Sequence, residues 1–299
     1  MKRPCALLFL LLLLAAAASG QMLARSSFST GPDGTTRGSA TFQLPAHMLQ
    51  PVLGAPYSAE EVSEHVQTLA SGVHITQTTS RVKEWRDSLG RTRTERPMSS
   101  LGRVAQEVPT LIQISDPVAG YLYTLDVEKK VAHRVAAPPP PEGSLADNRV
   151  YVHGGVSSVL FAEAAAAAAT APAPKRPAAN KKPSVRGQDV TTETLGTKTI
   201  DGVVVEGMRQ TTVYATGSQG NDAPFSVVSE DWWSSELKLM LLSTRDDPRS
   251  GVETHRFADL STQEPAQALF MVPGGYTVAD ETDSFTITWG VQEQGPSQP

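Results

Sequence analysis

The sequence predicts a mainly β protein of the α+β class. A large curved antiparallel sheet, resembling half a barrel, would carry one N-terminal helix packed on it. Two observations predict this arrangement. From Val73 onward apolar and polar residues alternate with a period of two, and turn pairs such as Asp201-Gly202 separate the runs. In addition, strands and helices do not alternate as a parallel α/β sheet requires. Two separate small β domains are the alternative arrangement.

Residues 1–20 have the features of a secretory signal peptide. Two basic residues precede an apolar run over 6–18, and Ala18 and Gly20 supply small residues at a cleavage site. The run is shorter than the roughly 20 residues of a membrane span, and an uncleaved anchor is the alternative. We therefore expect an exported protein, periplasmic or secreted, with no transmembrane anchor in the mature chain.

Composition excludes several classes of protein. The chain has 299 residues, of which 39% are hydrophobic and 19% charged, enough for a sizeable core. Its single cysteine, Cys5, lies in the leader, which excludes disulfides, thiol catalysis and cysteine-based zinc sites in the mature chain. Residues 188–299 carry six basic and seventeen acidic side chains, which argues against nucleic acid as a partner.

The first part of the mature chain is expected to contain a flexible arm and a helix. Residues 21–56 are rich in Gly, Ser, Thr and Pro and predict the flexible N-terminal arm. Ser58 and Glu61 match a capping box, the apolar residues of 58–71 follow at helical spacing, and Gly72 fits a C-cap. The pattern predicts an amphipathic helix over 58–71 that acts as a lid on the sheet.

Two runs of strands flank a low-complexity insert. Residues 57–136 hold the helix and a first antiparallel meander. A flexible Pro/Ala-rich and basic linker follows over 137–187. A second meander over 188–290 is expected to join the same sheet, with a short helix near 265–270 and a frayed tail over 291–299.

The search for reactive groups yields no catalytic residue, no metal site and no cofactor. The six histidines are scattered, and no phosphate-binding loop or nucleophile elbow occurs. Ser235 and Lys238 match S-x-x-K in spacing, but they fall in a turn leading into a strand rather than on a helix. The speculative ligand-binding residues are apolar ones of the expected helix and an aromatic pair: Val62, Val66, Leu69, Trp232 and Trp233.

Three stretches resemble a family of exported bacterial proteins of unknown function. They are 56–70, which contains Pro-Tyr-Ser-Ala-Glu, then Trp85–Arg93, and then 229–249 with Asp-Trp-Trp-Ser-Ser-Glu-Leu. More distantly, the layout is similar to the lipoprotein-carrier (LolA/LppX/RseB-like) architecture. That resemblance implies an apolar cavity for acyl chains or a sensor of envelope components, and it brings no catalytic residue.

The function favoured at this point is a non-enzymatic exported envelope protein. It would bind a hydrophobic, lipid- or lipoprotein-like ligand in the concavity of the sheet, or an envelope polymer or protein. A protein–protein interaction module without a cavity is the alternative, and a hydrolase with an unrecognised site is a weaker one.

Overall fold

The computed structural model describes residues 24–30, 35–45, 48, 50–97, 110–139 and 188–292. The expected signal peptide, nearly all of the linker and most of the C-terminal tail lie outside these residues. The described residues form fifteen strands and one short 3-10 helix, η1 (Gln267–Phe270), close to the short helix expected near 265–270.

Twelve strands form one large sheet, in the order β14-β8-β7-β6-β5-β4-β3-β13-β12-β11-β10-β9. The strands that precede the linker are β3 (Tyr57–Thr68), β4 (His74–Arg86), β5 (Thr92–Pro97), β6 (Thr110–Asp116), β7 (Tyr121–Asp126) and β8 (Val131–Ala136). Those that follow it are β9 (Gln188–Ile200), β10 (Val203–Tyr214), β11 (Phe225–Ser234), β12 (Leu239–Asp247), β13 (Gly251–Ser261) and β14 (Thr277–Asp280).

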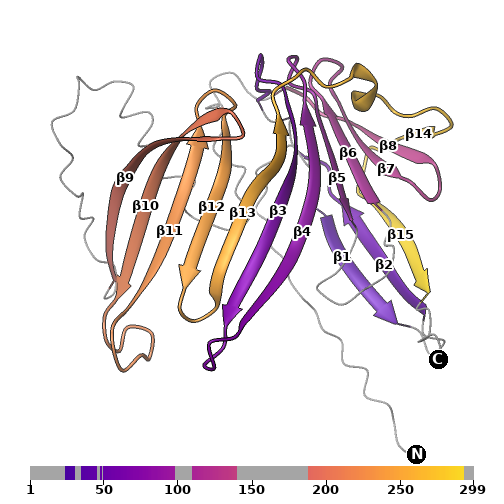
Figure 1. Cartoon of the computed structure of the whole chain (residues 1–299). Coiled ribbons are helices and arrows are strands. Elements are labelled where there is room, and N and C mark those ends of the chain that lie inside the picture. Colours follow the sequence, from indigo (N-terminus) through magenta and orange to yellow (C-terminus); the bar gives the residue numbers. More distant parts are fainter. Residues whose placement is uncertain are drawn as a thin grey trace, which may run out of the picture.

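The large sheet is open, with β9 and β14 at its edges (Figure 1). Its pairings are antiparallel except for β14, which runs parallel to β8. The predicted large antiparallel sheet is therefore confirmed, with one parallel strand added at an edge. Strands from before and after the linker meet in its middle, where β3 pairs with β13 from Val66–Val252 to Ser58–Ser261.

A second, three-stranded sheet corrects the expectation of a flexible arm over 21–56. It contains β1 (Ala24–Thr30), β2 (Thr35–Phe42) and β15 (Phe285–Gln292), in the order β1-β2-β15. The pairing of β2 with β15 brings the two ends of the described chain together. β15 also reaches Gln292, two residues beyond the boundary expected for the second meander.

The two sheets enclose one apolar core beside β6–β8. Phe42, Phe285 and Trp289 of the small sheet pack with Leu111, Leu122 and other side chains of the large sheet. The opposite face of the same strands packs on η1, where Phe270 contacts Ile114 and Leu125. Strands buried on both faces in this way carry apolar residues at both odd and even positions.

The expected helix over 58–71 is wrong, because these residues form β3 and the start of a hairpin turn. β3 pairs with β4 on one side and with β13 on the other, which makes it a central strand that cannot act as a lid. The spacing of Val62 and Val66 is ambiguous, since residues four apart share a face in a helix and also in a strand. Gly72 has φ +81° in the β3–β4 hairpin turn instead of capping a helix.

Candidate functional site

An apolar cluster lies on the large sheet away from the small one. Its members come from β3, β10, β12 and β13 and from the β11–β12 turn. They are Tyr57, Ala59, Val203, Val205, Leu237, Leu239, Leu241 and Phe257, with Ile200, Trp232 and Leu260 packed against them. All these residues belong to one sheet and its turns, and the upper ends of β9 and β10 bend over in this region (Figure 1). We call this set the apolar cluster.

A polar band continues the same face towards the lower ends of the strands. Along β3, Tyr57 and Ala59 are followed at alternate positions by Glu61 and Ser63, which therefore point to the same side. The register places Asp231, Ser243, His255 and Ser63 in one row across four strands. In this row Ser243 donates to Asp231 (2.6 Å) and the Ser63 hydroxyl hydrogen-bonds His255 Nδ1 (2.9 Å). The face thus changes from apolar to polar along β3 and β13.

Glu84 is a buried carboxyl between the apolar cluster and the polar band. It accepts a hydrogen bond from the hydroxyl of Tyr57 (3.0 Å). Burial, reinforced by the neighbouring Glu61 carboxylate, raises the pKa of Glu84 to about 7, against the lowering effects of Tyr57 and the nearby arginines Arg96 and Arg86. Burial also raises the pKa of Glu61, while Arg96 lowers it. The face therefore contains a carboxyl that changes charge near neutral pH.

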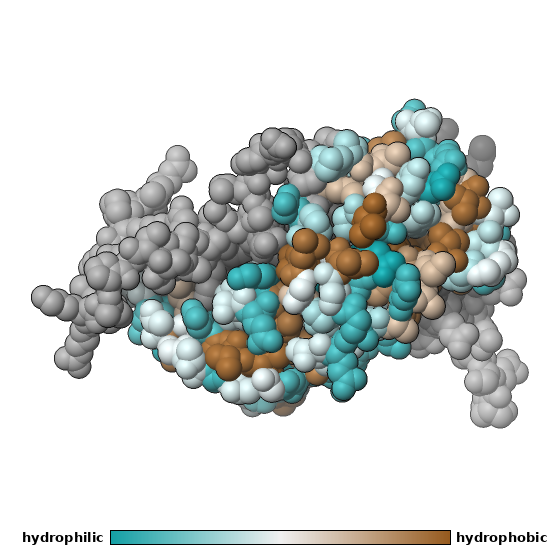
Figure 2. Space-filling view, turned by 90° about the horizontal axis from the view of Figure 1, so that it is seen from above, coloured by the Kyte–Doolittle hydropathy of each residue, from teal (hydrophilic) through white to brown (hydrophobic). Residues whose placement is uncertain are grey.

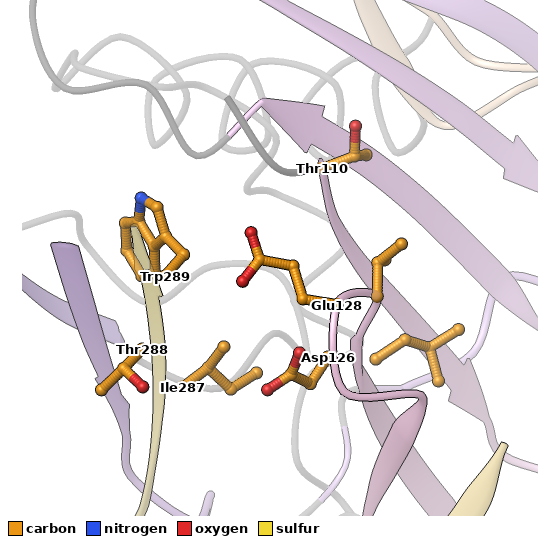
Figure 3. A pocket seen from close by; sticks show the side chains of 8 residues that line it. Thr110, Asp126, Glu128, Ile287, Thr288 and Trp289 are labelled. Atoms are coloured by element: carbon orange, nitrogen blue, oxygen red, sulfur yellow. The ribbon is translucent and has the colours of Figure 1, made fainter. Parts of the chain in front are cut away.

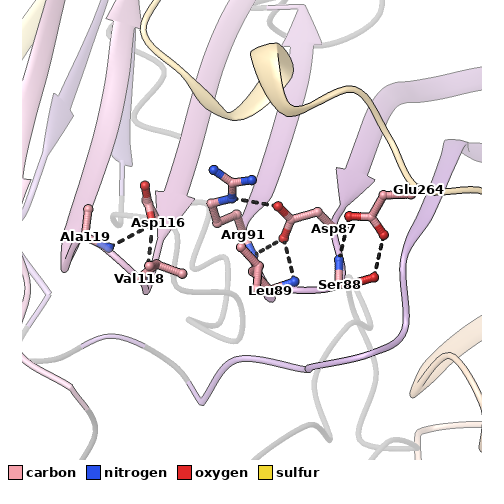
Figure 4. A network of polar contacts seen from close by, with 8 residues as sticks. All are labelled: Asp87, Ser88, Leu89, Arg91, Asp116, Val118, Ala119 and Glu264. Atoms are coloured by element: carbon pink, nitrogen blue, oxygen red, sulfur yellow. Dashed lines mark hydrogen bonds and ion pairs between the residues drawn. The ribbon is translucent and has the colours of Figure 1, made fainter.

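Residues of the Trp85–Arg93 motif stabilise the β4–β5 turn through hydrogen bonds (Figure 4). Asp87 accepts from the main-chain N–H groups of Leu89 and Arg91 and from Arg91 Nε at 2.6 Å. Ser88 binds the Glu264 carboxylate through its main chain and its hydroxyl, which ties the turn to the segment before η1.

Two arginines of the same motif bind main-chain carbonyls elsewhere. Arg86 donates to the carbonyls of Ala55 and Leu237, and Arg93 donates to that of Leu269. These contacts explain why the motif has this composition without assigning it a ligand.

A small pocket opens between the β7–β8 turn and β15 (Figure 3). Asp126, Glu128, Ile287 and Trp289 are among the residues that line it, and it holds about 210 Å³ of empty space, open solvent included. Ligand pockets are commonly 300–1,000 Å³. This pocket is therefore too small for an acyl chain, and Asp126 in it already accepts a hydrogen bond from Lys129 Nζ at 3.0 Å.

The upper rim of the large sheet exposes separate apolar side chains on its turns, visible among polar ones from above (Figure 2). They include Leu53, Leu89, Val118 and Met271, each more than half exposed. Single exposed apolar residues are ordinary on protein surfaces, so the rim is not assigned a ligand.

The five speculative ligand-binding residues do not form one site. Val62 is fully buried and Val66 half-buried, and both point away from the face that carries Tyr57 and Ala59. Leu69 is exposed beyond the end of β3. Trp232 packs on the apolar cluster and Trp233 is half-buried on β11.

Apart from Trp232, sequence reasoning missed the residues that make this face, because they come from strands whose neighbours the sequence does not reveal. One glycine in the sequence reflects this packing. Gly207 of β10 lies opposite Trp232, and a Cβ at that position would come within 2.5 Å of the indole.

No protein-family profile matches the chain, and no curated protein matches its sequence. Solved structures similar to it include MucB, at 12% identity over 74% of this chain and 58% of MucB, with a TM-score of 0.32. LprF from Mycobacterium bovis is 9% identical over 71% of this chain and 90% of LprF, with a TM-score of 0.26. A putative outer membrane lipoprotein-sorting protein domain from Vibrio parahaemolyticus is 8% identical over 69% of this chain and 85% of that domain, with a TM-score of 0.21.

One of these neighbours is named for lipoprotein sorting, the class of protein that the layout of the sequence resembles. At such TM-scores nothing about a ligand, a partner or an activity follows from the similarity. Within the part of the chain that the structure describes, no helix is long and apolar enough to cross a membrane.

Proposed function

We propose that this protein is an exported, non-enzymatic envelope protein that binds an amphipathic, lipid-like molecule on the curved face of the large sheet. The apolar part of the ligand packs on the half-buried members of the apolar cluster, Ile200, Trp232 and Leu260, and its polar part meets the polar band. The leader sequence supports export, and the fold supplies the binding face.

The observation that carries this proposal is the change from apolar to polar side chains along one face. On β13 the half-buried His255 lies two residues before the buried Phe257. On the antiparallel strand β3, the half-buried Glu61 lies two residues after the buried Ala59. Apolar surface contributes binding free energy of about 25 cal/mol per Å² removed from water. In the cluster this surface belongs to the half-buried members, because the other members are at most 8% exposed. Polar groups beside it fix the orientation of a ligand without adding much affinity.

The proposal is tested with two matched valine variants of the mature chain. Val205 and Val62 are both fully buried, but Val205 belongs to the apolar cluster and Val62 lies on the other side of β3. With the fluorescent fatty acid cis-parinaric acid as probe, Val205→Ala should weaken binding about fivefold, close to 1 kcal/mol. Val62→Ala should change it less than about twofold, although both variants lose some stability.

Equal affinities for the two variants, or no binding of the probe by the wild type, would overturn the assignment of the face. Native mass spectrometry of protein purified from its own envelope supplies an independent test. A retained mass of lipid size is the expected result.

A protein–protein interaction module is a second candidate function, because among the described residues β5 pairs with only the last four residues of β4, Lys83–Arg86, and leaves one edge of β4 unpaired below them. That edge is on β4 and does not include any residue of the apolar cluster.

A further inference from the structure

Lys198 is a half-buried cation at the margin of the apolar cluster. It lies on β9, where its register partner on β10 is Val205, and Ile200, two residues further on, pairs with Val203. Residues directly opposite each other share a face of the sheet, as do residues two apart on one strand. Lys198 therefore lies on the same side as the cluster residues Val203 and Val205.

The ammonium group of Lys198 lies over the indole of Trp232. The distance from Lys198 Nζ to the ring centroid is 3.7 Å, which is typical of a cation–π interaction. Trp232 is half-buried, packs on the apolar cluster and occupies the space that a side chain at Gly207 would need. This packing fixes the indole, and the indole holds the ammonium group beside apolar surface.

The Lys198 ammonium has no carboxylate partner among the described residues. Its neighbours on β10, Val203, Val205 and Gly207, carry no charge. An ammonium has three N–H donors, so contact with one ring face leaves donors for an oxygen acceptor. Arginines over aromatic rings elsewhere in the protein also donate hydrogen bonds to protein oxygens. They are Arg86, Arg91, Arg134 and Arg249.

An acidic group of a ligand fits Lys198 better than it fits the polar band. The band contains the carboxyl groups of Glu61 and Asp231, which disfavour a further acidic group beside them. Arg96, which lies near Glu61, already interacts with the carboxylates of Glu84 and Glu61. At Lys198 a positive charge adjoins half-buried apolar side chains, where Coulomb attraction is stronger than in bulk water because the effective dielectric constant is lower.

We propose that Lys198 binds the acidic group of an anionic amphiphile, a carboxylate or a phosphate ester, whose hydrocarbon part lies on Trp232 and Ile200. The polar band then meets the uncharged polar groups of the ligand. This inference rests on the proposed function and names the chemical class of its ligand.

The test compares three single variants of the mature chain. Lys198→Met keeps a long unbranched side chain over Trp232 but removes the charge, and Lys198→Arg retains a charge. Lys130→Met is the matched control, because Lys130 Nζ also lies over an aromatic ring, 5.1 Å from the centroid of Tyr276. Lys130 belongs to the β7–β8 turn and not to the apolar cluster. The probes are cis-parinaric acid and its uncharged methyl ester, both at pH 8.

Lys198→Met should weaken the binding of cis-parinaric acid by about fivefold, as the loss of a partly screened ion pair predicts. The same variant should change the affinity for the methyl ester less than about twofold, because the ester has no charge to lose. Lys198→Arg should bind the acid within about twofold of the wild type, and Lys130→Met should match the wild type with both probes.

Competition identifies the kind of anion that the site takes. Dodecyl phosphate should displace cis-parinaric acid from the wild type, whereas inorganic phosphate and dodecyltrimethylammonium at the same concentration should not. Displacement by inorganic phosphate would show a site for a free anion and would overturn the assignment to an amphiphile.

Equal affinities of the wild type and Lys198→Met for cis-parinaric acid would overturn the role of Lys198. So would an equal loss of the acid and the methyl ester in Lys198→Met, since the charge would then not be the cause. In both cases the wild type still binds the probes, and the apolar binding face stands. Failure of the wild type to bind either probe would overturn the proposed function together with this inference.

Discussion

Glu84 places an ionisable carboxyl inside the protein, where Tyr57 binds it and Arg86 and Arg96 lie near it. Its pKa is raised to about 7 from 4.5, chiefly by burial. The folded state therefore binds a proton between these two pH values that the unfolded state has released. By linkage, the free energy of unfolding falls as the pH rises from 4.5 to about 7 and changes little from this group outside that range.

Replacing Glu84 by glutamine should remove this pH dependence. Glu84→Gln should be more stable than the wild type at pH 8, by an amount on the order of 3 kcal/mol, and nearly equal to it at pH 4.5. Urea unfolding at the two pH values measures the difference. The control is Glu60→Gln, which changes an exposed ion pair with Arg81 (2.7 Å) on the neighbouring strand and should have a small effect at both pH values. A Glu84→Gln variant with the same pH profile as the wild type would refute the raised pKa.

At the scale of elements, the small sheet depends on a close contact between β2 and β15. Gly38 lies opposite Trp289, and the indole occupies the space where a Cβ would stand. The indole also belongs to the core between the two sheets. Glycine at this position of β2 is thus required by packing rather than by backbone conformation.

Gly38→Ala should therefore destabilise the protein by about 1–3 kcal/mol, the usual cost of overpacking a core. Gly290→Ala on β15 is the matched control, because a Cβ there meets nothing within 4 Å. Thermal unfolding followed by tryptophan fluorescence compares the two variants. Similar melting temperatures for both would show that the small sheet does not pack as described.

β3 shows how an element can be misread from its local pattern. The capping residues and the spacing of Val62 and Val66 suit a helix, but a helix there would leave β4 and β13 without their shared neighbour. Propensity for secondary structure amounts to fractions of a kcal/mol per residue. The hydrogen bonds and packing of a strand that is paired on both sides outweigh it.

At the scale of the whole molecule, the chain segments before and after the linker are joined by three strand pairings. β3 pairs with β13, β2 with β15, and β8 with β14. Neither half contains a complete sheet by itself, so the two halves fold as one structure.

Cleavage in the linker should leave the two halves associated. The stretch 137–187 has a Pro/Ala-rich sequence and presents lysine and arginine to trypsin. After limited digestion, we expect two fragments on a denaturing gel that elute together from a sizing column under native conditions. Guanidinium chloride should separate them. Separate elution without denaturant would contradict the single twelve-stranded sheet.

The sequence by itself determined the β character of the chain and the position of many of its turns. Turn pairs such as Asp201-Gly202 are local signals, and this pair predicted the hairpin that joins β9 and β10 in the structure. Tertiary structure alone decided which strands are neighbours, and with that the identity of β3, the small sheet and the face that carries the apolar cluster. The reason is physical: register and neighbours depend on hydrogen bonds and side-chain packing between residues far apart in the chain, as in the pairing of Phe42 with Phe285.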